Sequence, residues 1–182
     1  MDREELIRWS EPEQVLLLLD KSSEELKEML GDEFAVMKDY AQNNPHHCYN
    51  LLEHTVRTAA GMDCSGLSDE DAVQLRVAAL FHDIGKPVVA LQKNGKENPF
   101  IIPVTKENVE KKIHFVQKKC KEKGIYIPTV EDYKILMRLC YADAMAQSPK
   151  VIEKGVQIDS VEEKVTRLKA VERMIEIILA DK

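Results

Sequence analysis

Apolar residues recur three or four positions apart along most of the chain, which is the pattern of amphipathic helices. The clearest example is the C-terminal segment, whose apolar residues at helical spacing are Val161, Val165, Leu168, Ile175 and Leu179. Residues 72–81 are apolar on nearly every side. We therefore expect residues 72–81 to form the central helix of the fold.

Helix start signals divide the chain into segments. Each signal is a Ser or Thr followed three residues later by an acidic residue, so that the hydroxyl caps the free N–H groups of the first turn. The five signals are at Ser10, Ser22, Ser68, Thr129 and Ser160. Gly31, Gly85 and Pro149 are expected stops. The pattern predicts an all-α fold, a bundle of about six to eight helices.

The remaining segments predict connections. We expect residues 149–159 to be a connecting loop, and residues 86–103 to be a loop of active-site size that contains a short extended piece, FIIPV. The predicted organisation is one compact domain: a helical extension over 1–40, a metal-binding domain over 41–148, and a loop with a C-terminal packing helix over 149–182.

The charge of the chain narrows the choice of partners. The 182 residues include 26 Lys and Arg against 32 Asp and Glu, a formal net charge of -6. This balance disfavours a surface that binds nucleic acid throughout. Residues 106–123 are an exception, with a local charge of +4 from three glutamates and seven lysines: Lys106, Lys111, Lys112, Lys118, Lys119, Lys121 and Lys123. A solvated helix face is the simpler interpretation, and docking of RNA is the alternative.

The cysteines and the N-terminus predict a compartment. The four cysteines form no C-x-x-C pair, and the opening MDREELIRW lacks the plan of a signal peptide. The longest apolar run, residues 15–19, is far shorter than the roughly 20 residues of a membrane span. We expect a cytoplasmic protein with reduced thiols and no membrane-spanning segment.

Four residues form a candidate metal site: His54, His82, Asp83 and Asp143. Two imidazoles and two carboxylates suit one borderline to hard divalent ion, such as Mn, Mg, Ni, Co or Fe. Four protein ligands leave an octahedral ion about two positions for a water and a substrate oxygen. Adjacent helical residues point about 100° apart, so His82 and Asp83 reach one ion most easily where a helix ends.

The motifs around these residues resemble a known family. AALFHDIGKP is similar to the signature of the HD-domain metal-dependent phosphohydrolase superfamily. With QNNPHHCYNLLEHTV before it and LCYADAMAQ after it, the stretch over about residues 40–148 most closely resembles the HD domain of bacterial CCA-adding tRNA nucleotidyltransferases. No Gly-rich loop followed by paired carboxylates precedes it, so we expect no transferase core. The resemblance implies an HD-type helical bundle with His54, His82, Asp83 and Asp143 as metal ligands.

The resemblance also implies an activity. The expected reaction is hydrolysis, by a metal-activated water, of a phosphomonoester or a (cyclic) phosphodiester of a nucleotide or RNA end. Asp83 is expected to bind the metal and orient the water, and Lys86 to hold the phosphate; Arg57 and His47 are candidate substrate contacts. Lys86 could instead be a surface lysine, and Arg57 could pair with an acidic neighbour. Relatives often carry a His where FIIPVTKENVEK has none, so one ion is expected rather than two.

Two other functions remain open. A catalytically weak HD module could bind tRNA or another polyanion through the lysine-rich residues 106–123. A degenerate HD fold could act in oligomer assembly, with Trp9 and the leucine run at 15–19 facing a partner. Hydrolysis of a phosphorylated small molecule or nucleotide is the first hypothesis, because all four metal ligands are present.

Overall fold

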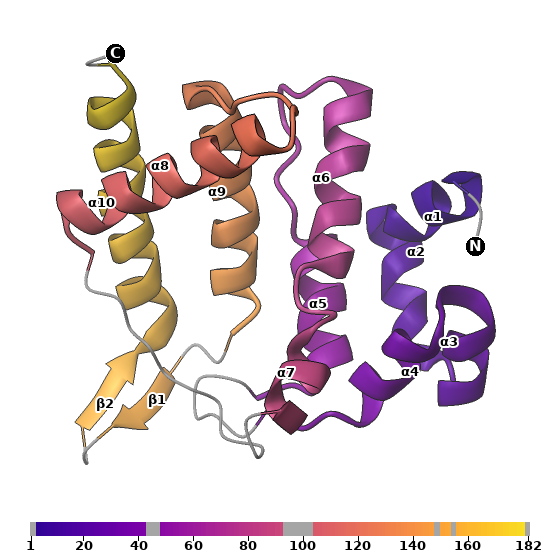
Figure 1. The fold of residues 1–182 in the computed structure, drawn as a ribbon. Coiled ribbons are helices and arrows are strands. Elements are labelled where there is room, and N and C mark those ends of the chain that lie inside the picture. The colour runs from indigo at the N-terminus through magenta and orange to yellow at the C-terminus, as the bar shows by residue number, and fades with distance from the viewer. Residues whose placement is uncertain (1–2, 43–47, 93–103, 148–149, 154–155, 181–182) are drawn as a thin grey trace.

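The chain folds into short and long helices with one small hairpin (Figure 1). The structure is a computed structural model that describes residues 3–42, 48–92, 104–147, 150–153 and 156–180. Its elements over these residues are α1 (Arg3–Ser10), α2 (Pro12–Leu16), η1 (Leu17–Asp20, a 3-10 helix), α3 (Ser23–Leu30), α4 (Asp32–Asp39), α5 (Leu51–Ala60), α6 (Asp69–Phe81), α7 (Lys86–Gln92), α8 (Lys106–Glu122), α9 (Val130–Met145), β1 (Lys150–Glu153), β2 (Val156–Asp159) and α10 (Ser160–Ala180). The predicted all-α class is confirmed. The helices outnumber the expected six to eight because breaks near Glu11, Lys21 and Gly31 divide the N-terminal region into short helices. None of the helices in these ranges combines the length and apolar character needed to cross a membrane.

Side-chain caps explain most of the helix starts. Three of the predicted signals are N-caps in the structure: Ser22, Ser68 and Thr129. The prediction at Ser10 was wrong, because Ser10 is the last residue of α1 and α2 begins at Pro12. The last helix begins at Ser160 as expected, although its cap is the side chain of Asp159, which accepts a hydrogen bond from the backbone N–H of Glu162.

Helix α5 lies at the centre of the described fold. It contacts α2, η1, α4, α6 and α9. Its buried residues are Leu51, Leu52, His54, Thr55, Val56, Thr58 and Ala59. Helix α6 was expected to be central, but it buries only Ala72, Leu75, Ala79 and Leu80. The expectation was wrong because α5 packs against the N-terminal helices as well as against α6 and α9, whereas one face of α6 stays partly exposed.

Two apolar cores meet at α9. The first core joins the N-terminal helices to α5 and α6 and contains Trp9, Val15 and Leu18. The second joins α8, α9 and α10 through Ile113, Tyr133, Met137, Ile175 and Ile178. Ala142 of α9 belongs to the first core, so α9 contributes to both. In Figure 1, α9 stands between the C-terminal helix and the α5–α6 pair.

Two predicted loops contain regular structure. The segment 149–159 was expected to be a loop, but it holds an antiparallel hairpin in which Lys150 pairs with Asp159 and Glu153 with Val156. β-branched residues on both sides of Gly155 are typical of such a hairpin. The segment 86–103 begins with α7 rather than a loop, because Pro87 is compatible with the first turn of a helix. The extended piece expected at FIIP lies outside the described residues.

Substitution of Phe34 tests the packing of the first core. It is fully buried on α4 and meets the ring of Phe81 edge-on, with centroids 5.2 Å apart. Because Phe34→Ala removes this ring and leaves a cavity, we expect it to lower the free energy of unfolding by about 3–5 kcal/mol in chemical denaturation. Val36→Ala on the same helix, at a half-exposed position, should change it by no more than about 0.5 kcal/mol. A loss below about 1 kcal/mol for Phe34→Ala would contradict this packing.

Candidate metal centre

Four side chains from three helical segments meet at one point. His54 comes from α5, His82 and Asp83 from the turn after α6, and Asp143 from the last turns of α9. One ligand atom of each lies within 4.8 Å of the corresponding atoms of the other three. Nε2 of His54 is 3.0 Å from Oδ1 of Asp143 and 3.6 Å from Oδ2 of Asp83. The structure thus brings together the four residues that the sequence singled out; we call this group the candidate centre.

The end of α6 allows two adjacent residues to face the same point. α6 ends at Phe81, and His82 is its C-cap. The following turn is closed by a hydrogen bond from the backbone N–H of Lys86 to the carbonyl of Asp83. Nε2 of His82 then lies 3.2 Å from Oδ2 of Asp83. Neighbours on a continuing helix would point in different directions, so this turn is what makes the pair convergent.

Backbone carbonyls orient both imidazoles. Nδ1 of His54 lies 3.1 Å from the carbonyl oxygen of Ala146, and Nδ1 of His82 lies 2.7 Å from that of Ala79. A carbonyl oxygen only accepts hydrogen bonds, so each Nδ1 carries the proton and donates it. In both rings Nε2 is therefore the nitrogen that faces the carboxylates. This is the usual arrangement for histidines that bind a metal.

The donor set fits a divalent ion. Nε2 of His82 is buried and makes no well-aligned hydrogen bond, although Oδ2 of Asp83 lies 3.2 Å away. Buried polar atoms without such bonds are costly unless another group satisfies them. An ion bound between the two imidazole nitrogens and the two carboxylates would do so, and this mixture of ligands suits a borderline to hard metal.

Burial and neighbouring charges shift the pKa values of His82, Asp83 and Asp143 in opposite directions. Burial lowers the pKa of His82, but its contacts with the carboxylates of Asp143 and Asp83 outweigh burial and raise the pKa to about 9. Burial raises the pKa of Asp83, but His82 and Lys86 outweigh it and lower the pKa to about 2. Burial likewise raises the pKa of Asp143, and His54, His82 and Lys164 together hold it well below its usual value. A protonated His82 thus supplies positive charge where an ion would supply it.

Lys86 contacts the candidate centre directly. Its Nζ lies 2.8 Å from Oδ2 of Asp83 and donates a 3.0 Å hydrogen bond to Oε1 of Gln42. The side chain of Lys86 is one-third exposed, so it can also reach a ligand from solvent. Lys86 is therefore part of the group of charged side chains at the candidate centre.

Arg57, a candidate substrate contact, pairs with a neighbour on its own helix. The guanidinium of Arg57 makes two hydrogen bonds to Glu53, of 2.8 and 3.0 Å, and lies over the ring of Tyr49. Arg57 thus makes the pairing with an acidic neighbour that the sequence left open. His47, the other candidate substrate contact, lies outside the described residues.

Sequence reasoning missed two polar residues beside the candidate centre. Nζ of Lys164, on α10, lies 2.5 Å from Oδ2 of Asp143. Oε1 of Gln42 accepts a hydrogen bond from Nζ of Lys86. Lys164 sits among other charged residues of an amphipathic helix, and Gln42 is the first residue of the motif QNNPHHCYNLLEHTV, where it was given no role. Only the packing of α10 against α9 places Lys164 at the site, so no local signal could have identified it.

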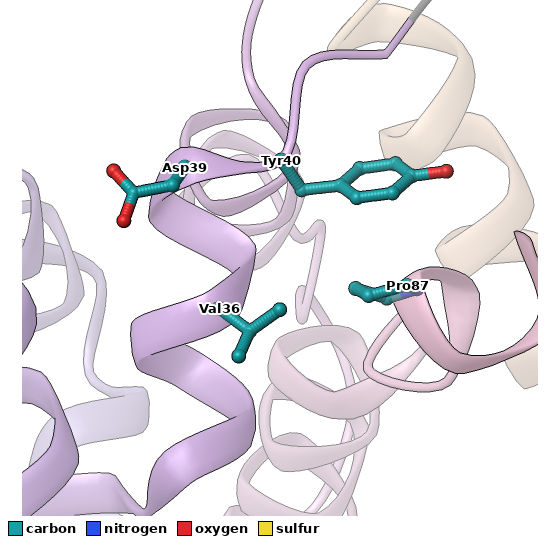
Figure 2. Close-up of a pocket in the computed structure, with 4 residues that line it drawn as sticks. All are labelled: Val36, Asp39, Tyr40 and Pro87. Atoms are coloured by element: carbon teal, nitrogen blue, oxygen red, sulfur yellow. The ribbon is translucent and has the colours of Figure 1, made fainter. Parts of the chain in front are cut away.

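A hollow lies beside α7 (Figure 2). It is lined by Val36, Asp39 and Tyr40 at the end of α4 and by Pro87 of α7. Figure 2 shows the Tyr40 ring, Pro87 and Val36 around the hollow, with the Asp39 carboxylate turned away. Pro87 directly follows Lys86 in the chain.

The comparisons with known proteins agree with this geometry. The family model of the HD domain matches residues 46–145, more than half of the chain. The match includes His54, His82, Asp83 and Asp143, and it excludes Gln42 and Lys164. No curated protein and no solved structure matches the chain.

The pKa of His82 predicts how the stability of the metal-free protein depends on pH. A raised pKa means that the folded state binds the proton more tightly, so the stabilisation is complete below the unfolded value of 6.5 and disappears as the pH rises through about 9. We expect the free energy of unfolding, measured in urea with a chelator, to fall by about 3 kcal/mol over this interval. In His82→Gln the free energy of unfolding should fall less over the same pH interval. If the stability of the wild-type protein did not change between these pH values, this would contradict the contacts of His82 with Asp83 and Asp143.

Proposed function

Since the chain belongs to the HD domain family, we propose that it is a divalent-metal-dependent phosphohydrolase, acting on a phosphomonoester or a (cyclic) phosphodiester of a nucleotide or RNA end. HD domains are generally metal-dependent hydrolases. The observation that carries the proposal is the convergence of the four ligand atoms within 4.8 Å. We propose His54, His82, Asp83 and Asp143 as the metal ligands, with one ion of the Mn, Mg, Ni, Co or Fe type.

The proposed roles follow from the positions of the side chains. A bound divalent ion would supply the positive charge that lowers the pKa of a water and neutralises a phosphoryl oxygen. Asp83, with a pKa of about 2 in the metal-free site, stays a carboxylate and orients the attacking water by accepting a hydrogen bond. Lys86 binds a phosphoryl oxygen. The water oxygen forms the new bond to phosphorus, the ester P–O bond breaks, and one proton of the water ends on the leaving oxygen.

Nucleotides and RNA ends are the proposed substrates for two reasons. Residues 40–148 resemble the HD domain of CCA-adding enzymes, whose substrate is an RNA end. The hollow at the end of α4 is lined mainly by apolar groups, with the ring of Tyr40 among them, and this composition suits a base or another flat group. We propose a cytoplasmic location, in keeping with the four free thiols.

The surface of α8 favours a second candidate function. Phe115 is 57% exposed on this helix, and Nζ of Lys119 lies 5.9 Å from the centre of its ring. Lysines interleaved with an exposed aromatic ring are typical of surfaces that bind single-stranded nucleic acid. Several of the lysines pair with glutamates of the same helix, among them Lys111 with Glu107. We therefore keep binding of tRNA or another polyanion through residues 106–123 as the alternative.

Asp83→Asn tests the hydrolase proposal. It preserves the shape of the side chain and removes its charge, so we expect kcat/KM to fall about a hundredfold or more in a panel of phosphomonoesters and diesters with Mn, Ni, Co or Mg. The matched control is Asp69→Asn, an exposed acid at the start of α6, which should leave turnover unchanged. Circular dichroism checks that both variants are folded.

Two outcomes would count against hydrolysis. Wild-type turnover in Asp83→Asn would show that the candidate centre is not the active site. A metal-loaded wild-type protein that hydrolyses none of the panel, but binds RNA with a salt dependence that Lys118→Ala and Lys121→Ala reduce, would favour the binding function.

A further inference from the structure

Each carboxylate of the candidate centre contacts its own lysine. Lys86 of α7 contacts Asp83, and Lys164 of α10 contacts Asp143. Oδ1 of Asp143 faces His54, while Oδ2 of the same group meets Lys164. The ammonium group of Lys164 therefore lies one carboxylate away from the point where the ligand atoms converge. Lys164 is about as exposed as Lys86, with 30% and 34% of their side chains accessible.

A buried amide donor adjoins Lys86. Gln42 is only 7% exposed, and its Oε1 accepts the hydrogen bond from Lys86. Its Nε2 is buried and has no hydrogen-bond partner among the described residues. An unsatisfied buried donor costs about 1–3 kcal/mol unless a ligand or water accepts from it. This side of the site thus offers an ammonium and an amide donor to a ligand rich in acceptor oxygens.

We propose that Lys164 is a second phosphate contact that acts together with Lys86, and that this pair of lysines selects dianionic phosphomonoesters over monoanionic diesters. The inference rests on the proposed hydrolase function and assigns its substrate class. Lys164 and Gln42 both lie outside residues 46–145, so the arrangement adds to what the family match covers.

Charge balance gives the reason for the selectivity. A divalent ion offsets the charges of Asp83 and Asp143, and the two lysines then leave the site with a formal charge of +2. A phosphomonoester dianion neutralises this charge, whereas a diester leaves +1 uncompensated in a partly buried site. Electrostatic matching of this kind discriminates between ligands of similar shape.

Binding of simple anions tests the proposal without turnover. The full chain loaded with Mn²⁺ is titrated calorimetrically with inorganic phosphate at about pH 8, where phosphate is mainly a dianion, and with the monoanion dimethyl phosphate. Because Lys164→Gln removes one charged contact, we expect phosphate to bind about tenfold more weakly or worse, and dimethyl phosphate to change by less than about threefold. Lys164→Arg should retain phosphate binding within about threefold.

Three further measurements identify the cause of a loss of phosphate binding. Lys169→Gln removes the same charge from an exposed position of α10 and should bind phosphate like the wild type. Mn²⁺ should bind Lys164→Gln as tightly as the wild type or more tightly, because a neighbouring positive charge has been removed. The ratio of kcat/KM for a monoester to that for a diester should fall in Lys164→Gln.

Three results would overturn the inference. Unchanged phosphate binding by Lys164→Gln would show that Lys164 does not contact the anion. A parallel loss of Mn²⁺ would make Lys164 a positioning residue for Asp143. If Lys164→Gln weakened the binding of both anions equally, Lys164 would not select dianions over monoanions. In each case a wild-type protein that still hydrolyses the panel leaves the proposed function intact, whereas a wild type that binds neither Mn²⁺ nor phosphate contradicts both.

Discussion

Two carboxylates held a few ångströms apart in a partly buried site must be neutralised, and the candidate centre is organised around that requirement. Asp83 and Asp143 both contact the imidazoles of His54 and His82, and each also contacts a lysine. In the metal-free chain, protonation of His82 supplies part of the charge, which is why its pKa rises despite burial. A divalent ion can replace that proton, so metal binding and the stability of this part of the fold are linked.

The helical packing brings the two carboxylates together. Buried α5 presents His54 between the N-terminal helices and α9, and the C-terminal end of α9 supplies both Asp143 and the carbonyl that orients His54. Thr58, which is also buried on α5, donates its hydroxyl hydrogen bond to the carbonyl of His54. Because α9 belongs to both apolar cores, α10 packs against it and places Lys164 beside Asp143. The site therefore depends on the contact between the two cores as well as on the HD region.

Much of this arrangement could be predicted from the sequence, because its signals are local. The helical spacing of apolar residues predicted the all-α class. The capping residues predicted the starts of α3, α6 and α9. The helix break after His82 and Asp83 could be read from its glycine and proline. Burial of α5 could not be predicted, since the ring of its polar residue His54 finds its partners, Asp143 and the carbonyl of Ala146, only in the folded chain. Lys164 and Gln42 could not be predicted either, because their contacts join segments that are distant along the chain. The hairpin within 149–159 does have a local signal, since β-branched residues stand on both sides of Gly155.

The central claim is that His54, His82, Asp83 and Asp143 hold one divalent ion. It is tested most directly by equilibrium dialysis of the metal-free full chain against Mn²⁺, with the bound metal measured by mass spectrometry. We expect one ion per chain for the wild type, and loss of that ion in Asp143→Ala under conditions where the variant remains folded. An absence of bound ion in the wild type, or the same stoichiometry and affinity in Asp143→Ala, would contradict the account.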